Sequence, residues 1–350
     1  MTGDALMEKM KTAVFGCGKI SDIYIINMQK SEILDVCCIA ASCIENTYDK
    51  AGRYGLQSRT IEDILEDKCI ELIVNLTPPL AHFDLIKKSL LAGKHVFTEK
   101  VLAASLEEAR ELIKLADKKG LYLGCAPETF LGGAIQAAKR TVDSGTIGMV
   151  TGCQASFNMN LSEMYPFFKM LTKKGAGIGM DRGVYFLTAL CAIMGPVAEV
   201  CGFVRTLNPV TDSKIESENQ MVASVKFKSG VLGTLNFNGN SVFPEVPELV
   251  IQGQEGMLHL PDPINFGGRV TLLKFGQWSE VCYESKYTSD SRGIGPVEMA
   301  YAIRSNEKDR TSKEMAFHIL EVFEAIEKSS VEKRYVTIES DFQIPENMKE

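Results

Sequence analysis

Two glycines near the start of the chain, separated by one residue, have the spacing needed to hold a phosphate group. Gly16-Cys17-Gly18-Lys19-Ile20-Ser21 follows the apolar segment 12–15, and an amphipathic segment comes directly after it. A strand that turns sharply into a helix at G-x-G-x-x-small is the usual dinucleotide-binding turn. Gly16 allows the tight turn, and Gly18 lets a pyrophosphate approach the backbone. The N–H groups that begin the next helix favour an anion.

Three further side chains are candidates for proton transfer. Lys100 follows the predicted strand 95–98, while Asp181 and Tyr185 lie at the start of the apolar, helix-like segment 183–194. Oxidation of a secondary alcohol requires a group that accepts the hydroxyl proton, and lysine, carboxylate and tyrosine side chains can all exchange protons. Asp181 also fits an N-cap of that helix, and Tyr185 also fits a core position.

Predicted strands and helices alternate in the first part of the chain and would position these groups. Apolar strands are expected at 34–41, 71–76, 95–98 and 121–125, and helices at 60–65, 82–92 and 105–119. This alternation predicts an α/β Rossmann fold with a doubly wound parallel sheet. Ligands bind beyond the carboxyl ends of such strands, so one edge should gather the residues Gly16, Gly18, Ser42, Thr77, Pro78, Glu99 and Lys100.

The pattern changes after residue 126. Segments 219–227 and 231–237 each alternate apolar and polar residues on either side of a short Lys-Ser-Gly turn, which indicates a β-hairpin. We therefore predict a Rossmann domain at 1–126, followed at 127–350 by an α+β substrate-binding and oligomerisation domain with a mainly antiparallel open sheet. His318, on an amphipathic helix predicted at 313–328, is interpreted as a packed histidine.

Composition narrows the class of protein. The chain has 350 residues and a net charge of -7, which argues against a nucleic-acid surface. Neither a signal peptide nor an apolar stretch long enough to span a bilayer is expected, so we predict no membrane partner. The ten cysteines are scattered without a C-x-x-C pair, which favours free thiols in a reducing cytoplasm. The four histidines lack metal-ligand spacing, so no metal is expected.

The identity of the dinucleotide depends on the end of the second strand. An NAD site often has an acid there to bind the ribose hydroxyls, but this chain has Ser42, and no arginine follows to hold a 2′-phosphate. Glu45 is a candidate for binding the ribose, and Lys50 or Arg53 is a candidate for binding a phosphate. NAD is the expected cofactor, with NADP as the alternative.

Taken in order, these segments resemble the Gfo/Idh/MocA family of nicotinamide-dependent sugar and cyclitol oxidoreductases. The resemblance rests on the glycine turn, Thr77-Pro78-Pro79 followed by His82, Ala92-Gly93-Lys94-His95-Val96-Phe97, Glu99-Lys100, Gly145-Thr146-Ile147-Gly148 and Asp181-x-Gly183. It covers nearly the whole chain. The stretches APETFLGGAIQ and DRGVYFLTALCAIMGPV are similar to one bacterial subgroup.

The resemblance implies a role for each candidate residue. It assigns catalysis to Lys100, Asp181 and Tyr185, and substrate contacts to Glu128, Tyr165 and Arg182. It assigns cofactor binding to Gly16, Gly18, Lys19, Ile20, Ser42, Thr77, Pro78, His82, Glu99 and Lys100. Members of the family form dimers or tetramers through the open sheet, so a homo-oligomer (dimer, tetramer or higher) is expected.

Three departures from the family pattern concern the site itself. Val101 stands where the family has proline, which removes the favoured setting for a cis peptide, so we expect the backbone near Lys100 to differ. Tyr185 holds the position of a histidine, and Thr188 that of an acid. The proton acceptor is therefore either Tyr185 or Lys100, with Asp181 orienting the lysine and a substrate hydroxyl.

The substrate class is inferred from the loop 162–179, which carries Tyr165, Phe167, Phe168, Lys173 and Lys174. Its aromatic faces and glycines fit a mobile cover for a sugar glycoside, although an interdomain or oligomer contact fits as well. The leading hypothesis is an NAD(P)-dependent oxidoreductase acting on a secondary ring hydroxyl of a sugar or glycoside, with C3 suggested by the family. The alternatives are an inositol or polyol dehydrogenase, an NAD-retaining glycosidase-like enzyme, and a non-catalytic cofactor-binding sensor.

Overall fold

The computed structural model describes residues 7–173, 175–207, 215–242 and 248–348. The chain divides into two compact units, one of residues 1–128 with 291–317 and the other of residues 129–290 with 318–350. The first segment ends close to residue 126, where the sequence places the domain boundary. The return of residues 291–317 to the first unit is a feature that the sequence does not predict.

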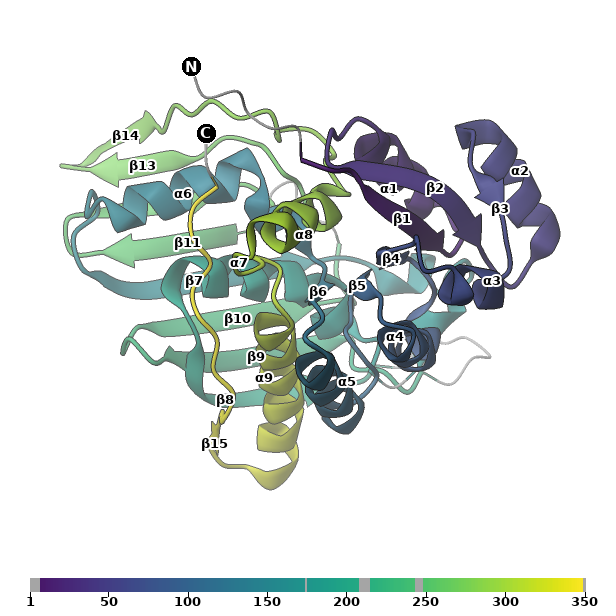
Figure 1. Cartoon of the computed structure of the whole chain (residues 1–350). Coiled ribbons are helices and arrows are strands. Elements are labelled where there is room, and N and C mark those ends of the chain that lie inside the picture. Colours follow the sequence, from purple (N-terminus) through teal and green to yellow (C-terminus); the bar gives the residue numbers. More distant parts are fainter. Residues whose placement is uncertain (1–6, 174, 208–214, 243–247, 349–350) are drawn as a thin grey trace, which may run out of the picture. The chain divides into compact units, whose positions relative to one another are not determined.

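The first unit is built on a six-stranded sheet in the order β3-β2-β1-β4-β5-β6, with every neighbouring pair parallel (Figure 1). Its strands are β1 (Met10–Phe15), β2 (Leu34–Ala40), β3 (Gln57–Ser58), β4 (Leu72–Asn75), β5 (His95–Thr98) and β6 (Leu123–Cys125). Its helices are α1 (Ile20–Gln29), α2 (Ile44–Tyr54), α3 (Ile61–Glu66), α4 (His82–Leu91), α5 (Leu106–Lys119) and α8 (Ile294–Ser305). The strand order reverses between β1 and β4, which is the switch point where dinucleotides bind. The predicted Rossmann fold is confirmed.

Local sequence signals explain where several of these helices begin and end. Thr60 accepts a hydrogen bond from the backbone N–H of Asp63 at the start of α3, and Ser105 accepts one from Glu108 at the start of α5. Gly120, at the end of α5, has a left-handed φ of 64° that a glycine adopts readily. Ser105 therefore caps the start of α5, and Gly120 ends it.

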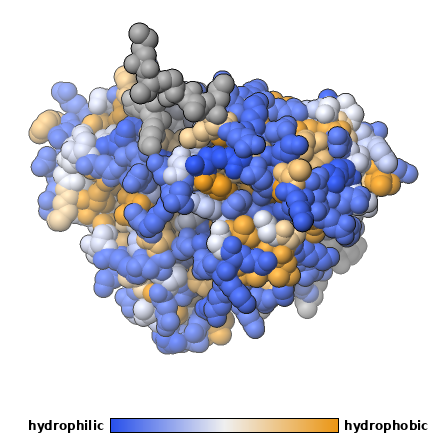
Figure 2. All heavy atoms as spheres, viewed as in Figure 1, coloured by the Kyte–Doolittle hydropathy of each residue, from blue (hydrophilic) through white to orange (hydrophobic). Residues whose placement is uncertain are grey.

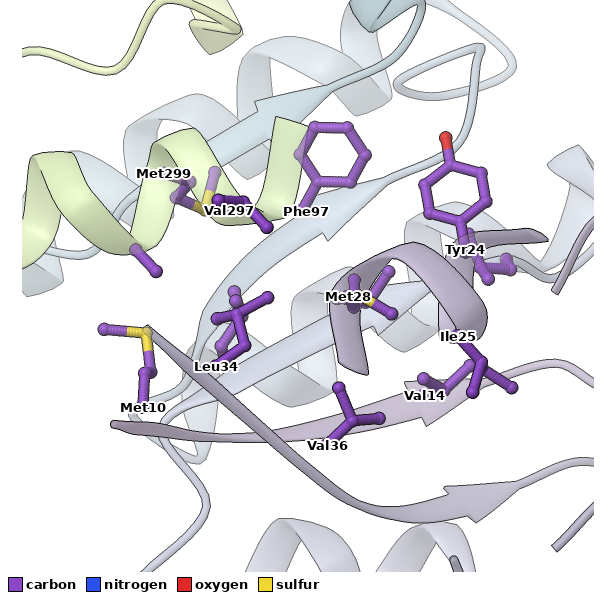
Figure 3. Close-up of a cluster of buried hydrophobic side chains, with 14 of the residues drawn as sticks. Met10, Val14, Tyr24, Ile25, Met28, Leu34, Val36, Phe97, Val297 and Met299 are labelled. Atoms are coloured by element: carbon purple, nitrogen blue, oxygen red, sulfur yellow. The ribbon is translucent and has the colours of Figure 1, made fainter. Parts of the chain in front are cut away.

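The core of the first unit draws on both of its chain segments. Figure 3 shows apolar side chains from β1, α1, β2, β5 and α8 packed together, among them Met10, Leu34 and Phe97. Val297 and Met299 of α8 belong to this buried cluster. Residues 291–317 join the first unit because α8 fills part of its core.

The second unit contains a nine-stranded sheet in the order β14-β13-β12-β11-β7-β10-β9-β8-β15. Its strands are β7 (Val150–Asn158), β8 (Val197–Arg205), β9 (Gln220–Phe227), β10 (Leu232–Asn238), β11 (Glu248–Gly253), β12 (Gly256–Leu260), β13 (Thr271–Lys274), β14 (Gln277–Glu280) and β15 (Val336–Thr337). The helices are α6 (Gly133–Asp143), α7 (Val184–Met194) and α9 (Lys313–Glu332), the last of which begins in the first unit. β10 pairs with β7 in parallel and with β9 in an antiparallel hairpin, so the mainly antiparallel sheet and the hairpin are confirmed.

His318 on α9 is fully buried in the second unit. Its Nε2 accepts a hydrogen bond from the backbone N–H of Val197 at 2.9 Å, and its Nδ1 lies 2.8 Å from Ser340 Oγ. Burial lowers the pKa of His318 to about 4, so the ring is neutral near pH 7. Its interpretation as a packed histidine is confirmed.

The surface of the described chain is mostly polar where it can be seen. Figure 2 shows hydrophobic residues as small areas among hydrophilic ones on the face in view. Among the described residues, no helix combines the length and the apolar character needed to cross a bilayer.

Candidate active site

The glycine turn has the geometry that its sequence predicts. Gly16 has a φ of +103°, and a Cβ added to it would lie 2.6 Å from the backbone oxygen of Leu76, so this position requires glycine. A Cβ added to Gly18 would meet no atom of the described chain within 4 Å, so the backbone there faces open space. α1 begins two residues later. A turn that is crowded at Gly16 and open at Gly18 fits a pyrophosphate lying against Gly18, with the exposed residues Lys19 and Ile20 beside it.

Lys50 stabilises this turn from within the protein. Its ammonium group lies 3.0 Å from the Gly18 carbonyl oxygen, 3.0 Å from Ser21 Oγ and 2.8 Å from an Asp22 carboxylate oxygen. A lysine has three donors, and all three have partners here. The interpretation that Lys50 reaches a cofactor phosphate is therefore wrong, because the side chain is buried and occupied by the turn itself.

The carboxyl ends of four strands form one edge, as predicted. Phe15 of β1 pairs with Ala40 of β2 and with Asn75 of β4, and Asn75 pairs with Thr98 of β5. The residues just beyond this line therefore lie at the same edge of the sheet: Gly16, Gly18, Ser42, Thr77, Pro78, Glu99 and Lys100.

His82 connects two backbone segments at this edge. Its Nε2 lies 2.8 Å from the Thr77 carbonyl oxygen and its Nδ1 lies 2.6 Å from that of Val101, while burial lowers the pKa of the ring. Thr77 in turn donates a hydrogen bond to the side chain of Asn75 at 2.7 Å. A neutral imidazole has a single N–H, so His82 donates to one of these two carbonyl oxygens at a time, and its contact with the cofactor stays a prediction.

The peptide bond between Lys100 and Val101 is cis. We expected the backbone near Lys100 to differ because Val101 stands where the family has proline. That expectation is wrong, since the cis peptide is present with valine. Hydrogen bonds flank the bond on both sides: Lys100 N–H donates to a Glu99 carboxylate oxygen at 3.1 Å, and the Val101 carbonyl lies beside His82.

Glu99 and Glu128 share the hydroxyl of a buried tyrosine. Tyr24 Oη lies 2.7 Å from Glu99 Oε1 and 3.0 Å from Glu128 Oε2. The other carboxylate oxygen of Glu128 accepts a hydrogen bond from the backbone N–H of Gly293 at 3.0 Å, just before α8. Glu128 is 1% exposed, and burial together with the nearby Glu99 charge raises its pKa to about 7. Its assignment to substrate, made from the family resemblance, stays a prediction.

Sequence reasoning did not identify Tyr24 as a member of the site. It lies on the buried stripe of α1 with Ser21, Ile25 and Met28, a spacing that is typical of core packing. The only available signal is a polar hydroxyl on an otherwise apolar stripe, since a buried tyrosine needs a partner for its O–H.

In the second unit, Asp181, Arg182 and Tyr185 lie on one continuous helical segment. A π-helical turn at Gly179–Gly183 runs directly into α7. Arg182 Nε lies 3.4 Å from Asp181 Oδ2, and Tyr185 is buried. The backbone N–H of Asp181 already donates to Gly177 at 2.8 Å, so Asp181 lies within the helical turn. The interpretation of Asp181 as the N-cap is wrong, because helical hydrogen bonding begins earlier in the chain.

Glu218 holds the start of this helical segment. One of its carboxylate oxygens accepts a hydrogen bond from Gly179 N–H at 3.0 Å, and its backbone carbonyl accepts one from Ile178. A Cβ on Gly177 would collide with the Glu218 carboxylate. Burial raises the pKa of Glu218 to about 7. The sequence offers no local signal for this contact, which joins residues far apart in the chain.

The aromatic loop divides into a buried and an exposed part. Tyr165 is buried and lies 3.4 Å from Asn219 Nδ2, whereas Phe167 and Phe168 are 81% and 47% exposed. The assignment of Tyr165 to substrate stays a prediction, and the two phenylalanines are the aromatic residues that the loop presents outward. Lys174 lies outside the described residues.

Comparison with known proteins agrees with this division of the chain. A family model described as "Oxidoreductase family, NAD-binding Rossmann fold" matches residues 10–126, and one described as "GFO/IDH/MocA C-terminal domain" matches residues 135–259. The two matches together span more than half of the 350 residues.

Curated relatives are distant. The chain is 27% identical to the uncharacterized oxidoreductase C115.03 of Schizosaccharomyces pombe, over 65% of this chain and 63% of that protein. The match to the uncharacterized oxidoreductase YhhX of Escherichia coli spans 54% of that protein, so the chain matches little more than half the length of some relatives. It is 23% identical to scyllo-inositol 2-dehydrogenase (NADP(+)) IolW of Bacillus subtilis, over 80% of this chain and 82% of that protein.

Solved structures share the fold at low sequence identity. A levoglucosan dehydrogenase in complex with NADH and L-sorbose superposes with a TM-score of 0.84 at 17% identity, over 95% of this chain and 100% of that one. The aldose-aldose oxidoreductase from Caulobacter crescentus, complexed with glycerol, gives 0.85 at 18% identity, over 94% and 100%. At these identities the similarity supports the fold.

Proposed function

Because the chain belongs to the Gfo/Idh/MocA family of NAD-binding oxidoreductases, we propose that it is an NAD(P)-dependent dehydrogenase. In this proposal it oxidises or reduces a secondary ring hydroxyl of a sugar or glycoside. The observation that carries the proposal is the position of Lys100 at the same strand edge as the glycine turn. Its backbone N–H donates to the Glu99 carboxylate, and the carbonyl of the next residue, Val101, lies beside His82.

The nucleotide site fits a dinucleotide on the evidence of its own backbone. The open space beside Gly18 and the start of α1 would hold the pyrophosphate, and exposed Ser42 would face the ribose of the adenosine. Glu99 and Lys100 would border the nicotinamide. NAD(P), when bound, supplies the hydride acceptor.

The protein groups would supply the proton chemistry. Lys100 or Tyr185 would take the proton from the reacting hydroxyl in its deprotonated form, because a free amine or a phenolate has the lone pair that accepts a proton. Asp181, whose carboxylate lies beside Arg182, would orient Lys100 and a neighbouring substrate hydroxyl.

Two substrate classes are in competition. Exposed Phe167 and Phe168 favour a glycoside, since flat aromatic faces pack against sugar rings, and oxidation at C3 is the form of the hypothesis that the family suggests. The similarity to scyllo-inositol 2-dehydrogenases of Bacillus subtilis favours an inositol instead. Both classes present a secondary ring hydroxyl to the same machinery.

The first experiment is a spectroscopic test of cofactor reduction. Purified protein is mixed with NAD or NADP and with free sugars, inositols or aryl glucosides, and absorbance of the reduced nicotinamide is followed. We expect a rise with one substrate class and one preferred cofactor. Binding of NADH without reduction of either cofactor by any member of the panel would contradict the enzyme and favour a sensor.

Replacing Tyr185 by phenylalanine tests the identity of the proton acceptor. If Tyr185 exchanges the proton, kcat should fall by about 10²-fold or more, because general base catalysis contributes about 10²–10⁴-fold. The ring is buried and phenylalanine keeps its packing, so Tm should change little. Turnover that is unchanged across the pH range would remove Tyr185 from this role and leave it to Lys100.

We further propose that the protein assembles as a homo-oligomer and works in the cytoplasm. Phe203 on β8 and Val222 on β9 are opposite each other in the sheet and are 73% and 47% exposed, which favours a partner on that face. All ten cysteines lie in the described part of the chain as free thiols, as expected in a reducing compartment.

A further inference from the structure

The contacts around Tyr24 leave one proton to be accounted for. Its hydroxyl lies within hydrogen-bond distance of Glu99 Oε1 and of Glu128 Oε2, yet a tyrosine has a single proton to donate. If both carboxyls were ionised, two neighbouring negative charges, that of buried Glu128 and that of half-buried Glu99, would compete for that proton. Like charges that share a buried site favour protonation of one of them.

An additional proton on Glu128 satisfies every group in the cluster. Glu128 then donates to Tyr24 Oη, Tyr24 donates to Glu99 Oε1, and Glu99 Oε2 accepts from the N–H of Lys100. The distances agree with this direction, because the 2.7 Å contact to Glu99 is shorter than the 3.0 Å contact to Glu128. Hydrogen bonds to an ionised carboxylate are the shorter kind.

The surroundings favour the placement of the additional proton on Glu128. Glu128 is almost completely buried, its charge is opposed by Glu99, and its pKa is raised to about 7. Arg292 and the Gly293 N–H at the start of α8 act in the opposite direction. Cys125 of β6 adds no charge, because burial raises the pKa of its thiol well above the usual range. Figure 3 shows the Tyr24 hydroxyl at the margin of the apolar cluster, pointing away from it.

We propose that Tyr24 and Glu128 are positioning residues for Lys100, and that with Glu99 they hold one shared proton that fixes the backbone at the catalytic lysine. The proposal rests on the proposed function for the role of Lys100. It adds two residues that lie outside the glycine turn and outside the helical segment of the second unit. The chain of bonds runs from the start of α8 through Glu128, Tyr24 and Glu99 to the N–H of Lys100.

Two variants test the proposal, one that removes the Tyr24 hydroxyl and one that removes the titratable proton of Glu128. Tyr24→Phe removes the hydroxyl and keeps the ring in the core. Glu128→Gln keeps the shape and imitates the protonated acid, since its amide donates to Tyr24 and its carbonyl accepts from Gly293. Tyr122→Phe is the matched control, because it removes a 2.8 Å hydrogen bond from the Tyr122 hydroxyl to the Glu307 carbonyl. Tyr122 directly precedes β6, so it lies at the end of the strands opposite to the edge that carries Lys100.

We expect Tyr24→Phe to lower kcat by about tenfold or more, equivalent to ~1.4 kcal/mol of barrier, with NADH affinity unchanged within about twofold. In Glu128→Gln, kcat should stay constant through pH 7 relative to its own value at lower pH, because this variant lacks the shared proton whose loss lowers kcat near pH 7 in the wild type. Tyr122→Phe should match the wild type. A Tyr24→Phe enzyme with wild-type kcat, or a Glu128→Gln enzyme whose kcat still declines near pH 7 as in the wild type, would overturn the proposal.

Infrared spectroscopy gives a readout that does not depend on turnover. The difference between the wild-type and Glu128→Gln spectra should contain the carbonyl stretch of a buried protonated carboxyl group that disappears as pH rises. The band of Glu218, whose pKa burial also raises to about 7, occurs in both proteins and cancels in this difference. If no substrate in the panel is turned over but the band behaves in this way, the proposed function fails and the shared proton stands. If the difference spectrum contains no such band, the shared proton is refuted whatever the activity.

Discussion

Replacing Lys100 by methionine should lower kcat by about 10²–10⁴-fold while NADH still binds. Methionine keeps most of the length of the side chain but removes both its charge and its exchangeable protons, and general acid–base catalysis contributes about this factor. The hydrogen bond from residue 100 to Glu99 should persist, because the backbone N–H donates it and the side chain takes no part in it. Stopped-flow or steady-state reduction of NAD(P), together with NADH fluorescence titration, provides the two measurements.

Two further variants make the Lys100 result specific. Lys100→Arg keeps a positive charge that does not lose its proton, so activity retained in this variant would indicate an electrostatic role and not proton exchange. Lys118→Met removes an exposed lysine from the last turn of α5 in the same unit and should leave kcat unchanged. Lys100→Met activity within about twofold of the wild type would exclude Lys100 from the chemistry.

Gly16→Ala should destabilise the first unit and abolish NADH binding. The φ of +103° disfavours any L-residue, at about 1–3 kcal/mol. The new Cβ would also lie 2.6 Å from the Leu76 carbonyl oxygen, which is part of the backbone and cannot turn aside as a side chain could. Overpacking of this kind costs about 1–3 kcal/mol more. Thermal unfolding and NADH titration report the two losses.

Gly18 and Gly55 provide matched controls for Gly16. Gly55 has a φ of +68°, and a Cβ added there would have no atom within 4 Å. Gly55→Ala therefore measures the cost of the left-handed backbone conformation without a steric clash, and it should lower Tm less than Gly16→Ala. Gly18→Ala meets no protein atom and should keep the wild-type Tm but weaken NADH binding at least tenfold, ~1.4 kcal/mol, by occupying the space of the pyrophosphate. Wild-type NADH affinity in Gly18→Ala would show that the dinucleotide does not lie against this turn.

Local patterns in the sequence predicted the parts of the fold that depend on local physics. The turn at Gly16 and Gly18 and the hairpin of β9 and β10 each follow from residues a few positions apart. The edge that carries Lys100 also followed, because alternation of strand and helix implies parallel strands whose carboxyl ends meet.

Contacts between distant parts of the chain were not predictable in the same way. Lys50 looked like a phosphate ligand because nothing near it in sequence shows that Gly18, Ser21 and Asp22 occupy all its donors. Tyr24 resembled an ordinary core residue because Glu99 and Glu128, which share its hydroxyl, lie far along the chain.

The late return of residues 291–317 to the first unit has a consequence for biosynthesis. A nascent chain that has emerged as far as residue 128 contains the whole six-stranded sheet but lacks α8, whose Val297 and Met299 complete the buried cluster. Its apolar surface stays uncovered while the ribosome makes residues 129–290, the interval in which exposed apolar surface invites association with other chains. The Gly293 N–H that binds Glu128 arrives with the same segment, so the nucleotide-binding unit reaches its final form only after residues 129–290 have been made.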